Sequence, residues 1–131
     1  MEQASALAPL AQWVAEFDGA ALDAETRERL FASVFDYGCA LWSGTGHGLY
    51  DAYLNGMAAV SGESGPCSVA GRTRRFPLAQ AAGLNAAIAH FWEVDDADRV
   101  STSHPGITVI SAVLALAEAF PRISRDRLAG A

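Results

Sequence analysis

The segment from Pro105 to Phe120 constrains the fold of this chain more than any other. It is apolar on nearly every side, it begins with a proline, and Pro121 follows it directly. Proline is tolerated in the first turn of a helix but ends a helix elsewhere, so the segment predicts one helix with clear limits. Because such a helix is apolar all round, we expect other elements to pack against it on every side.

Several other segments have apolar residues at helical spacing. Helices are predicted over residues 7–17, 24–41 after the N-cap residue Asp23, 49–60, 78–92, and 125–128. Turn-forming residues predict a loop over 61–66, followed by a short extended piece over 67–70 and a basic loop over 71–75. The sequence therefore predicts an all-α fold, a compact bundle of five to six helices in one domain spanning residues 1–131.

The composition excludes several classes of function. The chain has 51% hydrophobic and 18% charged residues, which favours a packed globule over disorder. Its net charge is −6 and it contains no lysine, so a cationic surface for nucleic acid is not expected. The longest apolar stretch is shorter than the roughly 20 residues of a membrane span. No nucleic-acid or membrane partner is therefore predicted.

The two cysteines indicate the compartment. Cys39 and Cys67 lie far apart and form no CxxC pair, which fits reduced thiols better than a disulfide framework or a zinc site. The N-terminal residues also lack the pattern of an export signal. A cytoplasmic protein is expected.

The candidate chemistry lies between His90 and Pro105. His90 and Glu93 would lie one turn apart on one helix face, and His104 begins the next helix. Four carboxylates fall within six residues, at Glu93, Asp95, Asp96 and Asp98. Crowded carboxylates repel one another and hold protons more tightly, and a nearby imidazole exchanges protons near neutral pH, so the segment predicts general acid/base chemistry.

Plainer interpretations of the same segment remain open. Acidic links between helices are commonly solvated turns, and His104 before Pro105 is also typical of a helix start. A calcium loop does not fit, because its central glycine and closing glutamate are missing. Neither a metal nor another cofactor is expected.

Short motifs also occur in a particular order along the chain. They are Gly71-Arg72-Thr73-Arg74-Arg75, Ala81-Ala82-Gly83-Leu84-Asn85 through His90, Asp95-Asp96, His104-Pro105, and Leu114-Ala115-Leu116-Ala117-Glu118. This ordered set resembles the MmgE/PrpD family, whose members include 2-methylcitrate dehydratase and cis-aconitate decarboxylase. The N-terminal part, with Leu10 to Phe17 and Phe35-Asp36-Tyr37-Gly38, is similar to that family's opening helices.

The resemblance implies part of a large helical domain, cofactor-free acid/base chemistry on carboxylate substrates, and an active site at a cleft against a lid domain. Family members are a few times longer, and their catalytic lysine lies beyond the point that matches Ala131. By resemblance His104 matches the histidine beside the substrate, and Asp95 and Asp96 match the paired aspartates. Glu93 replaces a usual aspartate, and Ala97 replaces a common threonine.

These matches give two hypotheses from different classes. In the first, the chain is one subunit of a split MmgE/PrpD-like lyase that acts on a small carboxylate or acyl substrate. His104, Glu93 and Asp95 would be catalytic, and His90, Asp96 and Arg72 would bind substrate, because arginine grips carboxylates bidentately. A second chain would complete the site. In the second hypothesis the chain is a non-catalytic assembly or regulatory subunit that kept the fold and lost the chemistry. The departures at Glu93 and Ala97 favour this hypothesis. A third possibility is a recruited enzyme that acts as a homo-oligomer, in which two copies of His104 face each other across a pocket.

Overall fold

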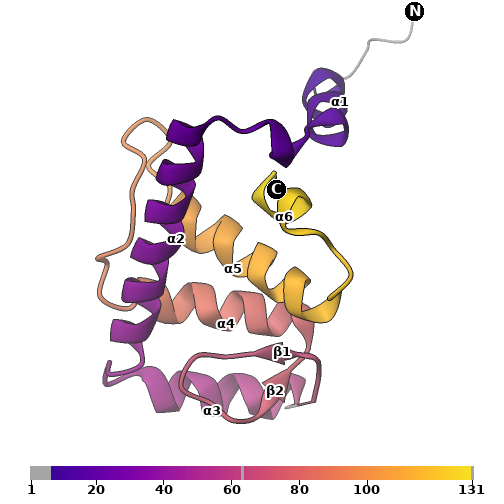
Figure 1. The fold of residues 1–131 in the computed structure, drawn as a ribbon. Coiled ribbons are helices and arrows are strands. Elements are labelled where there is room, and N and C mark those ends of the chain that lie inside the picture. Colours follow the sequence, from indigo (N-terminus) through magenta and orange to yellow (C-terminus); the bar gives the residue numbers. More distant parts are fainter. Residues whose placement is uncertain (1–6, 63, 131) are drawn as a thin grey trace, which may run out of the picture.

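The structure of the protein is a computed structural model that describes residues 7–62 and 64–130 (Figure 1). Within these residues the chain forms six α-helices, one 3-10 turn and one two-stranded sheet. The helices are α1 (Ala8–Glu16), α2 (Ala24–Gly44), α3 (Tyr50–Ser61), α4 (Leu78–His90), α5 (Pro105–Ala119) and α6 (Arg125–Ala129). The predicted all-α bundle of five to six helices is confirmed.

Local chemistry fixes where several helices begin. The Asp23 carboxylate accepts a 2.7 Å hydrogen bond from the Thr26 backbone N–H, and this bond lowers the pKa of Asp23. Ser124 caps α6 in the same way, by accepting from the backbone N–H of Arg127. Pro105 occupies the first position of α5, where its missing N–H costs no hydrogen bond. These helix starts agree with the sequence analysis.

The small sheet is the main element that the sequence analysis missed. β1 (Cys67–Ser68) pairs antiparallel with β2 (Arg75–Phe76), so the predicted extended piece is half of a hairpin. The basic segment that was predicted as a loop contributes Arg75 to the second strand. The Arg75 guanidinium donates to the Pro66 carbonyl oxygen and to the Ser68 hydroxyl, which holds the two strands together. A further short 3-10 turn, η1 (Gly19–Ala21), follows Asp18.

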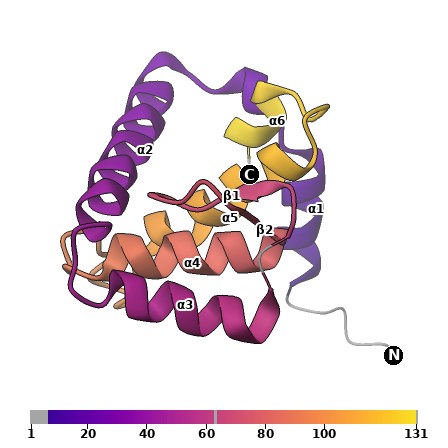
Figure 2. The same ribbon diagram turned by 90° about the horizontal axis from the view of Figure 1, so that it is seen from below.

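Helix α4 is the centre of the molecule. It packs against α2, α3, α5 and both strands, and it lies between α3 and α5 in Figures 1 and 2. Its buried side chains join two groups of core residues. The first group is Tyr50, Leu54, Cys67, Val69, Phe76, Ala81, Leu84, Ile88 and Ala115, and the second is Tyr37, Ala40, Ala89, Ile107 and Ile110.

Helix α5 is covered on one face only within the described part of the chain. Ile107, Ile110 and Ala115 are buried, whereas Val109 and Leu116 on the opposite side are 47% and 37% exposed. The prediction that α5 has neighbours all round is therefore wrong for the residues described. The apolar half that remains is available to further protein.

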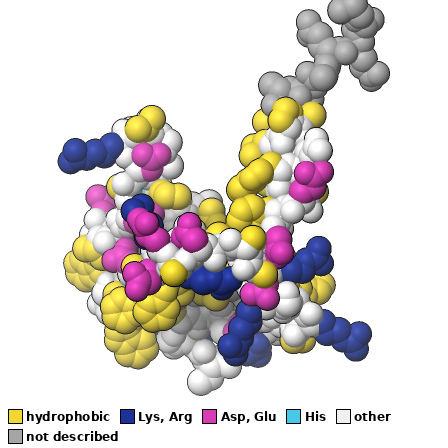
Figure 3. Space-filling model, turned by 45° about the horizontal axis from the view of Figure 1, so that its top comes forward, with side chains coloured by type: hydrophobic (Ala, Val, Ile, Leu, Met, Phe, Trp, Pro, Cys, Tyr) yellow, Lys and Arg dark blue, Asp and Glu magenta, His cyan; other side chains and the backbone are white. Residues whose placement is uncertain are grey.

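The first two helices also present apolar side chains to solvent. Helix α1 projects from the bundle and has no buried residue, and its Trp13 is 55% exposed (Figures 1 and 3). In Figure 3 hydrophobic side chains line this projecting arm and gather in a second patch at the lower left. On α2, Phe31 and Trp42 are about three-quarters exposed, at 73% and 75%. None of the helices in the described residues combines the length and apolar character that a membrane crossing requires.

Helices α2 and α4 approach each other closely at a glycine. A Cβ atom placed on Gly44 would lie 1.9 Å from the Ile88 carbonyl oxygen, which is far inside van der Waals contact. The buried Gly44 is therefore required for the two backbones to meet at this point.

We predict that Gly44→Ala lowers the free energy of unfolding by about 3 kcal/mol, because the new methyl group must push α2 away from α4. The matched control is Gly38→Ala in the same helix, where a Cβ atom meets nothing within 4 Å. That variant should be about 0.5–1 kcal/mol more stable, because alanine is the better helix former. Urea unfolding followed by circular dichroism measures both, and equal effects would contradict the close approach.

The two cysteines have opposite surroundings. Both thiols are free, and Cys39 is exposed whereas Cys67 is fully buried. The Cys67 Sγ lies 3.2 Å from the Ala115 carbonyl oxygen, as a hydrogen-bond donor. Burial, with a smaller effect from the nearby Glu118 carboxylate, raises the pKa of the Cys67 thiol.

Because the thiolate is the reactive form, we predict that iodoacetamide at pH 8 modifies Cys39 and leaves Cys67 intact in the folded protein. Both thiols should react once the chain is unfolded in denaturant. Mass spectrometry of the intact protein counts the modified thiols against time. Equal labelling rates in the folded protein would contradict the buried position of Cys67.

Candidate functional site

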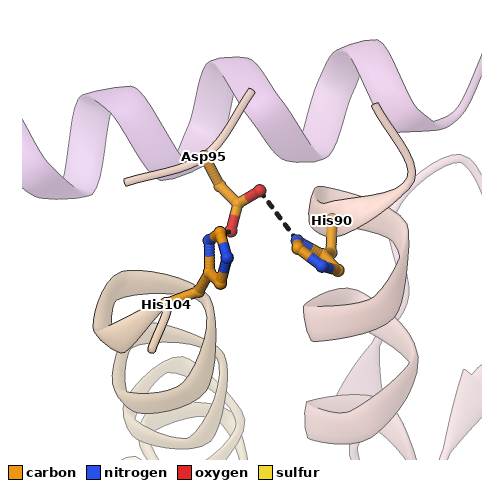
Figure 4. A group of neighbouring side chains, drawn as sticks. All are labelled: His90, Asp95 and His104. Carbon is orange, nitrogen blue, oxygen red and sulfur yellow. Dashed lines mark hydrogen bonds and ion pairs between the residues drawn. The ribbon is translucent and has the colours of Figure 1, made fainter. Parts of the chain in front are cut away.

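Three side chains meet where α4 ends and α5 begins (Figure 4). His90 is the last residue of α4, Asp95 lies in the connecting loop, and His104 is the residue directly before α5. We call this group the His–Asp–His cluster. It brings together two residues that the sequence analysis assigned to catalysis, His104 and Asp95, and one that it assigned to substrate binding, His90.

The Asp95 carboxylate is the centre of the cluster. Its side chain is 1% exposed, and each of its two oxygens faces one imidazole. His90 Nδ1 lies 2.9 Å from Oδ1, and His104 Nδ1 lies 2.9 Å from Oδ2. The two rings contact each other edge to face, with centroids 4.6 Å apart. One buried carboxylate therefore fixes two imidazoles.

The two contacts differ in quality. The His90 Nδ1 and Asp95 Oδ1 atoms are aligned for a hydrogen bond. The His104 Nδ1 and Asp95 Oδ2 atoms are both buried, and neither has an aligned hydrogen-bond partner among the described residues. The imidazoles keep about a third of their side-chain surface exposed, 38% for His90 and 34% for His104. The cluster is thus closed at the carboxylate and open at the outer edge of the rings.

The backbone of the connecting loop explains how Asp95 reaches this position. Glu93 has a φ of 50°, in the left-handed region that side chains other than glycine seldom adopt, and its N–H bonds to the His90 carbonyl oxygen. Thr102 has a φ of 52°, just before a point where Asp98 and Ser103 form an isolated antiparallel bridge. A left-handed residue therefore turns the chain on each side of the loop between the two histidines, and the surrounding contacts hold both residues in this costly conformation.

Neighbouring aspartates hold the same loop in place. Both oxygens of Asp96 lie close to the Gly106 N–H, at 3.0 and 3.1 Å, so this carboxylate caps the first turn of α5. Asp98 accepts hydrogen bonds from the Val100 N–H and the Ser101 hydroxyl, and these bonds lower its pKa. Asp98 is thus ionised near neutral pH, and the expectation of a carboxylate that holds its proton does not apply to it.

One expected placement is wrong. Helix α4 ends at His90 and not near Trp92, so Glu93 does not share a helix face with His90. The Glu93 N–H bonds to the His90 carbonyl oxygen in a turn, and the Trp92 indole donates to the Ser43 carbonyl oxygen, which holds the end of α4 against α2. Glu93 is exposed, and Asp95 is the carboxylate that contacts His90.

Arg72 lies in a different setting. Its guanidinium forms a 2.8 Å ion pair with Asp51 and stands 5.2 Å from the centre of the Tyr50 ring. Together with Asn55, Thr73 and Arg74 it lines a polar hollow of about 300 Å³. The structure thus groups Arg72 with this hollow and with Asp51.

The third histidine was not singled out from the sequence. His47 packs against the rings of Phe91 and Trp92, with centroids 5.1 and 4.5 Å away. Its Nδ1 accepts a hydrogen bond from the Leu49 N–H. No sequence motif connects His47 with Phe91, because the contact joins residues more than 40 positions apart. Its neighbours make it a packing residue and a useful control for the other two histidines.

Comparison with known proteins identifies the family. The family profile described as the MmgE/PrpD N-terminal domain matches residues 8–131, which is nearly the whole chain. The chain belongs to the MmgE/PrpD family. No curated protein and no solved structure gives a significant match. The resemblance inferred from the ordered motifs is therefore confirmed for the MmgE/PrpD N-terminal domain.

In this MmgE/PrpD domain, the His–Asp–His cluster has two chemical capacities. A buried carboxylate that contacts imidazole Nδ1 atoms stabilises the protonated ring and leaves Nε2 to exchange protons. The same three residues also offer one ligand atom each within 4.8 Å of one another, a spacing that suits a metal ion.

We predict that Asp95→Ala in this MmgE/PrpD domain lowers the free energy of unfolding by about 3 kcal/mol, because it leaves two imidazoles without their buried partner. Asp96→Ala, which removes only the cap on α5, should cost about 1 kcal/mol. Urea unfolding of both variants at pH 7 measures the difference. A larger loss for Asp96→Ala would show that the loop depends on the cap and not on the cluster.

Proposed function

We propose that this MmgE/PrpD domain supplies the acid/base part of a lyase that acts on a small carboxylate or acyl substrate without a cofactor. His104 is the group that exchanges a proton with the substrate, and Asp95 orients it. The observation that supports the proposal most is the buried Asp95 carboxylate, 2.9 Å from the Nδ1 atoms of both His90 and His104.

The chemistry follows from this arrangement. With Nδ1 directed to a carboxylate, a neutral imidazole takes up a proton at Nε2, and the carboxylate then stabilises the imidazolium. In a dehydration, His104 Nε2 would accept a proton from the carbon next to the substrate carboxylate or acyl group. The electron pair of that C–H bond forms the C=C bond as the C–O bond on the neighbouring carbon breaks. The hydroxyl group leaves as water with the proton that His104 Nε2 gives up, which returns the imidazole to its neutral form.

The other predicted site residues have supporting roles in this proposal. His90 shares Asp95 with His104 and limits how far that carboxylate can turn. Asp96 holds the loop on α5 through Gly106, so it shapes the site without needing to touch the substrate. Glu93 is exposed next to the cluster in sequence and remains a candidate contact for the substrate. Arg72 is paired with Asp51 through Nη2, so it would bind a carboxylate in its polar hollow through its other N–H groups.

We further propose that a second polypeptide completes the site, as in a split enzyme. Phe31 and Trp42 are about three-quarters exposed and one side of α5 is uncovered, and large exposed apolar surface is typical of faces that bind another protein. A partner chain that covers this surface would also supply catalytic groups that this chain lacks, since it contains no lysine.

We predict that His104→Gln abolishes turnover by the complex of this chain with its partner, with a loss of at least about 100-fold. The product of a neighbouring gene is the first partner to co-express, and native mass spectrometry reports whether a complex forms. Small hydroxy acids and unsaturated acids are then screened by ultraviolet absorbance for alkene formation and by carbon dioxide release.

His47→Gln is the matched control, because it removes the histidine that lies outside the cluster and should retain turnover. Wild-type activity in His104→Gln would contradict the assignment. A stable complex that turns over none of these acids would instead favour the non-catalytic assembly subunit.

A further inference from the structure

The His–Asp–His cluster has the composition of a transition-metal site. Two imidazole nitrogens and one carboxylate are the donor set that proteins use for zinc and for non-haem iron, whereas calcium and magnesium prefer oxygen donors alone. The three residues lie in one segment of the chain but on three elements, the end of α4, the connecting loop and the start of α5, so the fold brings the donors together.

The distances suit a single ion. Ligand atoms bound to one Zn²⁺ at about 2.0–2.1 Å lie roughly 3.0–3.4 Å apart, depending on the coordination geometry. Each imidazole Nδ1 lies 2.9 Å from one oxygen of Asp95, and all three ligand atoms lie within 4.8 Å of one another. Because both imidazoles are partly exposed, a small rotation of the rings closes the set around an ion.

The contact between His104 and Asp95 is the second observation that points to a ligand. Asp95 Oδ2 and His104 Nδ1 are buried and close, yet neither has an aligned hydrogen bond among the described residues. The 2.9 Å contact is an ion pair when His104 is protonated, but a carboxylate oxygen without an aligned hydrogen bond is costly in a side chain that is 1% exposed. A cation between the two atoms would satisfy both, since it needs a lone pair from each and no proton between them.

We propose that the His–Asp–His cluster binds a divalent transition-metal ion of the zinc class through His90 Nδ1, His104 Nδ1 and Asp95. The three protein ligands leave at least one coordination position for water or a substrate carboxylate. On binding, each neutral imidazole carries its proton on Nε2, so that Nδ1 presents its lone pair to the metal.

The metal regulates the acid/base chemistry of the same residues. Once His104 Nδ1 is coordinated and Nε2 carries the proton, no basic nitrogen remains on that ring to accept a proton from carbon. Zinc binding therefore inhibits the lyase, a consequence that rests on the proposed function, whereas the metal site itself does not.

The test uses the full chain without an affinity tag. Calorimetric titration with Zn²⁺ should give one site per chain, and Co²⁺ should give visible absorption bands without the charge-transfer band of a thiolate ligand. His90→Gln and His104→Gln should each weaken Zn²⁺ binding by more than about 10-fold. These substitutions keep the size and polarity of the side chain, and circular dichroism shows whether the variants fold.

His47→Gln and Cys39→Ser are the matched controls, and both should bind Zn²⁺ as the unsubstituted chain does. Binding that is lost in either control, or that persists in both cluster variants, would overturn the site. If Zn²⁺ binds at the cluster but the complex shows no lyase activity, the metal site is supported and the proposed function fails. If turnover depends on His104 while Zn²⁺ binds elsewhere or not at all, the proposed function stands and the metal site fails.

Discussion

The contact of one buried carboxylate with two imidazoles organises this molecule. Asp95 joins the last residue of α4 to the residue before α5, and these two helices are the most extensively packed pair in the fold. The loop between them is long enough to adopt many conformations. Three contacts restrict its conformation: the buried Asp95 between the two imidazoles, Asp96 on the start of α5, and the Asp98–Ser103 bridge. The site and the scaffold are thus held by the same few polar contacts.

The distribution of apolar surface gives the second constraint. The hairpin, α3 and α4 enclose a well-buried core, while α1, α2 and the outer half of α5 present large apolar side chains to solvent. One end of the domain therefore has a buried apolar core, and the other end leaves apolar side chains exposed to solvent. The cluster lies on the loop that joins α4 to α5, and α5 belongs to both regions. This arrangement is consistent with the proposed function, in which a second polypeptide closes the site.

Much of the fold and the three members of the His–Asp–His cluster were predictable from the sequence. Helical spacing, the N-cap at Asp23 and the prolines at 105 and 121 define the main helices, because these signals act over a few residues. The ordered motifs identify the family, and His90, Asp95 and His104 are all among the predicted site residues.

The geometry of the His–Asp–His cluster was not predictable from the sequence, because it depends on contacts between residues far apart in the chain. The Trp92–Ser43 hydrogen bond and the left-handed turn at Glu93 end α4 earlier than helical spacing implies, and they replace Glu93 by Asp95 as the partner of His90. The β2 strand was missed for a similar reason, since a two-residue strand leaves no periodic signal and is defined by its pairing with β1. The close contact at Gly44 has a mechanical consequence. The Ile88 carbonyl oxygen lies against Gly44 and Ile88 is two residues before His90, so the packing of α2 at this glycine also limits where the end of α4, and with it His90, can lie.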